Sequence, residues 1–222
     1  MKALKPLCAI ACVLLSSSAW AQDAVKSNPT HYKVVFENAS VRVLRISYAA
    51  GAKSTMHSHP DTIVVPLTTA KVQFTGADGK AQDSDLAADS ALYTPASSHS
   101  VTNLTKGPID GILIEFKTPA PGTATLPASR PGLAMKMLAE GPRAVAYRTT
   151  AEPTFHEAPG SKHEYDQVVI AVAPSQISLS IDGKPAKSTW AKGDVQFIGR
   201  GQAHEAKNTG GKPVDMLIVS IK

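Results

Sequence analysis

The chain has 222 residues with 23 basic and 18 acidic side chains, a formal net charge of +5, and only 2 cysteines. This mild basic excess is not gathered into an arginine-rich or lysine-rich cluster, which argues against nucleic-acid binding. Both cysteines fall within the first 21 residues. A fold built from the rest of the chain therefore depends on a hydrophobic core and cannot rely on disulfide bonds.

The first 21 residues have the pattern of a secretory signal peptide. Lys2 and Lys5 form a short positive start, an apolar stretch follows, and Ala19-Trp20-Ala21 has the small-x-small form of a cleavage site. The apolar stretch is shorter than the roughly 20 residues that span a bilayer. We expect residues 1–21 to be removed, leaving a periplasmic or secreted protein with no membrane insertion.

The chain beyond residue 21 reads as β-structure, taken in order. Short β-branched or alternating runs predict strands, and turn signals such as Asp78-Gly79 and Asp182-Gly183 separate them. The expected strands lie at 41–48, 62–67, 71–76, 111–117, 145–150, 167–172, 177–181 and 215–222. Many short strands at even spacing are typical of a sandwich or barrel. A linker rich in Pro and Ala and a short helix are expected within 119–142, the helix at 131–142.

The two sides of that linker repeat each other. Residues 88–117 align with 193–222 at a constant offset of 105, which places His99 over His204 and Asn103 over Asn208. A repeat of this length indicates two copies of one unit. We expect the copies to span residues 32–118 and 143–222.

Histidines fall at matching places in the two copies. His57 and His59 stand two residues apart in the first copy and precede His99, while His163 and His204 occupy related positions in the second. The pattern resembles the cupin superfamily, and specifically its two-domain members, the bicupins. The matching motif residues are Gly51, His57, His59, His99 and Asn103 in the first copy and Gly193, Gly201, His204 and Asn208 in the second.

The resemblance implies two tandem cupin (jelly-roll) β-barrels, an all-β fold, with a divalent metal held inside a barrel by three histidines and a glutamate. This chain departs from that pattern. Ile63 or Val64 stands where the first copy should carry the glutamate. In the second copy Ser161 replaces the first histidine and Gln167 the glutamate.

The chemistry of the first copy favours a metal site. Side chains two apart on a strand point to the same face, so His57 and His59 can both face a barrel interior with His99. Neutral imidazole suits Fe, Zn, Cu or Ni, and three such ligands leave open coordination positions. Three-histidine ferrous cupins of the kind the resemblance implies are O2-dependent ring- and diketone-cleaving enzymes, which favours Fe(II), with Mn, Ni, Cu or Zn as alternatives. Surface histidines on a loop are the other interpretation.

The second copy leaves two interpretations open. His163, Gln167 and His204 could hold a second metal, or they could line a remnant cavity that only binds a ligand, with Tyr165 also lining it. The leading hypothesis for the whole chain is an exported Fe(II)-dependent dioxygenase acting on a small oxygenated compound. The alternative is a non-catalytic ligand-binding or sensing protein. The expected partner is a small molecule, and the resemblance allows a homodimer.

Overall fold

The computed structural model describes residues 22–117 and 127–222, so the expected signal peptide at 1–21 and part of the expected linker, 118–126, lie outside the described residues. The described chain is almost entirely β-structure, and none of its helices is long and apolar enough to cross a membrane. The first half contains β1 (Gln22–Asp23), α1 (Ala24–Ser27), β2 (Tyr32–Glu37), β3 (Val41–Tyr48), β4 (His57–His59), β5 (Thr62–Pro66), β6 (Ala70–Gly76), β7 (Ala81–Leu86), β8 (Leu92–Thr94), β9 (Ser97–Asn103) and β10 (Ile109–Phe116). The second half contains β11 (Leu133–Glu140), β12 (Ala144–Ala151), β13 (Asp166–Ala171), β14 (Ile177–Ile181), β15 (Lys184–Lys187), β16 (Val195–Ile198), β17 (His204–Asn208) and β18 (Val214–Ile221).

The two halves repeat one strand order. In the first half, one sheet runs β2-β3-β10-β5-β8 and faces a second sheet of order β1-β4-β9-β6-β7. In the second half, the corresponding sheets run β11-β12-β18-β13-β16 and β15-β14-β17. Each half encloses its own apolar core, with Leu44 and Leu113 buried in the first and Trp190 and Met216 buried in the second. The expectation of an all-β fold with two tandem jelly-roll barrels is confirmed.

The helix expected at 131–142 is wrong. Residues Leu133–Glu140 form strand β11, which pairs antiparallel with β12 along the edge of a sheet. Leu, Ala, Met and Lys are strong helix formers, but an isolated helix of this length is marginal in water. Pairing with β12 instead satisfies the backbone groups of an open sheet edge and buries Leu133.

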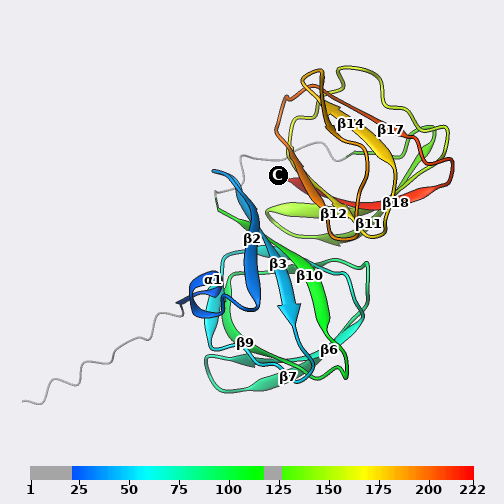
Figure 1. Cartoon of the computed structure of the whole chain (residues 1–222). Helices are drawn as coiled ribbons and strands as arrows, with labels where there is room; N and C mark the ends of the chain where they lie inside the picture. Colours follow the sequence, from blue (N-terminus) through cyan, green and yellow to red (C-terminus); the bar gives the residue numbers. More distant parts are fainter. Residues whose placement is uncertain (1–21, 118–126) are drawn as a thin grey trace, which may run out of the picture.

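The largest apolar cluster lies between the two barrels. Alternate residues of β10 point to opposite faces, so Ile112 and Ile114 pack outward against Leu217 and Val219 of β18, while Leu113 faces the first barrel. Phe36 of β2 stacks on Phe197 of β16 with ring centroids 5.1 Å apart. Figure 1 shows the β2–β3–β10 layer lying against the β11–β12–β18 layer. Burial on both faces explains why β10 is apolar almost throughout.

Candidate metal centre

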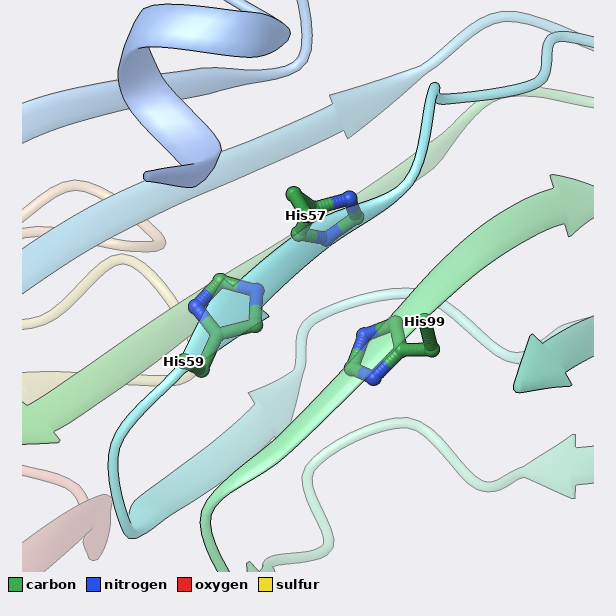
Figure 2. A group of neighbouring side chains, drawn as sticks. All are labelled: His57, His59 and His99. Atoms are coloured by element: carbon green, nitrogen blue, oxygen red, sulfur yellow. The ribbon is translucent and has the colours of Figure 1, made fainter. Parts of the chain in front are cut away.

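Two neighbouring strands bring three histidines together inside the first barrel. His57 and His59 lie on β4, and β9 pairs with it so that His99 stands directly opposite His57. One ring nitrogen from each residue lies within 4.8 Å of the others. The side chains project from the two strands into the same space (Figure 2). His57 and His59 are buried, which argues against histidines on an exposed loop.

Hydrogen bonds fix which nitrogen of two rings is free. Nδ1 of His57 lies 2.8 Å from the carbonyl oxygen of Thr55, and Nδ1 of His59 lies 2.6 Å from Oε1 of Glu115. A carbonyl oxygen only accepts, and the buried carboxylate also accepts, so each Nδ1 carries the proton and each Nε2 keeps its lone pair. Nε2 of His59 is buried and has no hydrogen-bond partner. An unpartnered buried nitrogen beside two other imidazoles fits a divalent metal.

Glu115 belongs to an ion-pair chain behind His59. Its second oxygen accepts from Nε of Arg42 at 2.5 Å, and the same guanidinium reaches Asp23 at 2.5 Å. Burial alone would raise the pKa of Glu115, but the hydrogen bonds from His59 and Arg42 outweigh it and hold that pKa below its usual value. Glu115 is therefore ionised and orients His59 as a carboxylate. The sequence analysis placed no carboxylate near this site.

Burial also keeps two of the histidines, His57 and His99, neutral. It lowers the pKa of His57, and together with the neighbouring His57 and His59 it lowers the pKa of His99 to about 3. The imidazoles of His57 and His99 are accordingly unprotonated at neutral pH, which is the form that binds metals.

Two tyrosines continue the hydrogen-bond network into the cavity. The hydroxyl of Tyr48 donates to that of Tyr32 at 2.8 Å, and the hydroxyl of Tyr32 lies 3.0 Å from Nε2 of His57. Because Nδ1 of His57 is the protonated nitrogen, Nε2 accepts this bond. A metal bound at Nε2 would use the same lone pair and would displace the Tyr32 hydroxyl from it. Burial raises the pKa of Tyr32 well above its usual value, so the phenol keeps its proton. Sequence reasoning missed Tyr32, which lies far along the chain from the histidine motif.

A cavity of about 360 Å³ opens beside the three histidines. His59 and His99 form part of its wall, and most of the rest is apolar. Of the two positions where a glutamate was expected, Val64 faces this cavity and Ile63 packs between the barrels. Val64 thus occupies the position where the cupin pattern has its glutamate, so the wall beside the histidines carries no base at that position.

The second barrel gathers a different set of ligand types. His163 and His204 approach Glu157, with one ligand atom from each within 4.8 Å of the others. Oε2 of Glu157 lies 3.4 Å from Nε2 of His204, and its other oxygen is ion-paired with Arg130. Gln167 is buried and lines the same cavity, which measures only about 80 Å³.

Tyr165 lies outside that small cavity. Its ring stacks on His163 with centroids 4.9 Å apart, and both residues border a second, more open hollow. Glu157 was not singled out from the sequence, because it precedes the motif by several residues. A backbone bridge between Ser161 and His204 matches the pairing of His57 with His99, so the first ligand position in this barrel is a serine.

Comparison with known proteins shows the fold. No protein-family model matches the chain, and no curated protein sequence matches it. Among solved structures, AerE from Microcystis aeruginosa has a TM-score of 0.65 at 15% identity, covering 86% of this chain and 97% of that one. A cupin 2 conserved barrel domain protein from Leptotrichia buccalis has a TM-score of 0.59 at 14% identity, covering 86% and 88%.

A third similar structure is the salicylate 1,2-dioxygenase from Pseudoaminobacter salicylatoxidans in its gentisate adduct. It has a TM-score of 0.62 at 12% identity, covering 84% of this chain and 70% of that one. These likenesses show that the chain has the cupin fold, the class that the paired barrels and the histidine cluster had indicated.

Proposed function

We propose that the first barrel is an Fe(II)-dependent dioxygenase site for a small oxygenated compound. One observation carries this proposal: His57, His59 and His99 converge beside a cavity, and the buried Nε2 of His59 has no partner. Three neutral imidazoles leave open coordination positions for a substrate and O2. The similarity to a salicylate dioxygenase supports this reaction class among cupin folds.

Each polar residue around the cluster has a defined task in this proposal. Glu115 accepts the hydrogen bond from Nδ1 of His59 and so keeps the proton on that nitrogen. Arg42 donates to the other oxygen of Glu115 and fixes its position. The hydroxyls of Tyr32 and Tyr48 provide hydrogen bonds at the cavity wall, while apolar residues exclude water. When bound, Fe(II) would supply the charge that polarises substrate oxygens and would pass electrons from the substrate to O2.

The overall reaction needs no external reductant. In cleavage of a carbon–carbon bond by O2, both oxygen atoms enter the products and the substrate supplies the electrons. This agrees with a cavity in which Val64 stands at the glutamate position, since a hydrolase or isomerase needs a general base within reach of its substrate. We further propose that the chain acts outside the cytoplasm after removal of residues 1–21.

The apolar wall also supports a second candidate function. A non-catalytic cupin that binds or senses a ligand would need the cavity but no acid or base at Val64. An oxygen-electrode screen of the Fe(II)-loaded protein against diketones and hydroxylated aromatic compounds separates the two proposals. Oxygen uptake that disappears in His99→Ala supports the dioxygenase. Ligands that raise the melting temperature without oxygen uptake support the binding protein, and turnover that persists under strict anaerobiosis contradicts the dioxygenase.

A further inference from the structure

The charges around the first cavity indicate which compounds it accepts. No lysine or arginine belongs to its wall among the described residues. Asp110 contributes to the wall, but its carboxylate is ion-paired with Arg45. Apart from this ion pair, the side chains that line the cavity include no carboxylate, ammonium or guanidinium group.

Arg42, the cation behind the histidines, is neutralised by two carboxylates. Arg42 lies between Glu115 and Asp23 and binds both carboxylates, so the group of three carries a net charge of −1. Glu115 is 1% exposed, which leaves this charge poorly screened by water. A divalent ion at the histidines would offset this charge there, but a substrate carboxylate that lies beyond the metal-bound oxygens would find no guanidinium or ammonium group in the wall to pair with.

The rest of the cavity wall suits a ligand with an apolar carbon skeleton. Phe74, Val72 and Leu113 line the cavity, and the neutral side chains of Gln82 and Ser84 come from β7 at its side. Gln82 is exposed and Ser84 only partly buried, which places the polar rim nearer to solvent than the apolar core. An uncharged molecule buries its carbon skeleton here without losing the hydration of a charge.

We propose that this cavity selects uncharged compounds that carry two neighbouring oxygens on an apolar or aromatic body, and rejects their carboxylated counterparts. The inference rests on the proposed metal site, to which the two oxygens would bind. Leaving a charge without a partner in the apolar part of the cavity costs ~1.4–2.7 kcal/mol, which corresponds to a preference of about 10- to 100-fold for the neutral compound.

The test compares matched probes by calorimetry on the full chain loaded with Zn(II), which needs no oxygen chemistry. Catechol is compared with 3,4-dihydroxybenzoate, and pentane-2,4-dione with acetoacetate. We expect the neutral member of each pair to bind at least tenfold more tightly. Equal or tighter binding of the carboxylates, or no binding of either neutral probe, overturns the inference.

A charge placed on the wall provides the second arm. Gln82 pairs with Phe74 across β6 and β7, and both face the cavity, so Gln82→Lys adds a cation there. Gln73 points to the opposite face, where its amide donates to Asp83, so Gln73→Lys makes the same substitution outside. Gln82→Lys should raise the affinity for 3,4-dihydroxybenzoate about tenfold and leave catechol unchanged, whereas Gln73→Lys should change neither.

An equal gain in both variants would mean that the overall charge of the chain governs binding, and this would contradict the inference. The outcome is also separable from the proposed reaction. If the Fe(II) protein consumes no oxygen but prefers neutral probes, the dioxygenase is wrong and the selectivity stands. If it consumes oxygen with carboxylated compounds in preference, the selectivity is wrong and the reaction class stands.

Discussion

Replacing Glu115 with glutamine should weaken metal binding although Glu115 is not itself a ligand. Its two oxygens accept from Nδ1 of His59 at 2.6 Å and from Nε of Arg42 at 2.5 Å. Glutamine has only one oxygen, which the charged guanidinium of Arg42 should retain. The amide NH2 then faces Nδ1 of His59, and the imidazole must move its proton to Nε2, the nitrogen that faces the cluster.

Loss of such a supporting hydrogen bond costs 10- to 100-fold in metal affinity, or ~1.4–2.7 kcal/mol. Competition with a chelator of known affinity, using Zn(II) and Co(II), measures the change. Glu205→Gln is the matched control, because Glu205 lies 2.5 Å from His156, whose side chain is 46% exposed, and neither residue belongs to the three-histidine cluster of the first barrel. Wild-type affinity in Glu115→Gln, with Arg42 and the fold intact, would refute the reasoning.

Two further predictions concern stability. Ile112 is fully buried between the barrels, so Ile112→Ala should lower the free energy of unfolding by ~2–5 kcal/mol in urea titrations, while Val34→Ala, at a 42% exposed position, should change it little. In metal-free protein, His99 has a pKa of about 3 when folded and an ordinary value near 6.5 when unfolded. The unfolded state therefore takes up a proton first, and stability should fall as the pH drops below about 6.5, by up to ~1.4 kcal/mol per pH unit for this residue. Between about pH 7.5 and 5, the free energy of unfolding should depend less on pH in His99→Gln than in the unchanged protein. The same pH dependence in both proteins would count against this explanation.

The strands that the sequence predicted well are those buried on both faces. Runs such as 111–117 and 215–222 are apolar because one side packs inside a barrel and the other against the second barrel. Their apolar character was visible, but the contact between the barrels was not, because pattern alone does not say what covers a face. Edge strands such as β7, with mostly exposed polar residues, carry no such signal.

The histidine cluster followed from spacing, while its supporting residues did not. His57 and His59 are two apart on one strand, and the repeat aligned His99 with His204. Glu115 could have been suspected, since it is a carboxylate flanked by apolar residues in a buried strand and the repeat places Ser220 there. Its pairing with Arg42 depends on the register of β10 with β3, which local sequence does not specify.

The most direct test of the metal centre is anomalous diffraction from crystals of the protein grown with one equivalent of Zn(II) or Fe(II), together with metal analysis of His57→Ala and His204→Ala. The account predicts one ion per chain, for Zn(II) about 2.0–2.1 Å from Nε2 of His57 and His59 and from a ring nitrogen of His99, lost in His57→Ala and kept in His204→Ala. An ion bound at Glu157, His163 and His204, retained in His57→Ala and lost in His204→Ala, would contradict it.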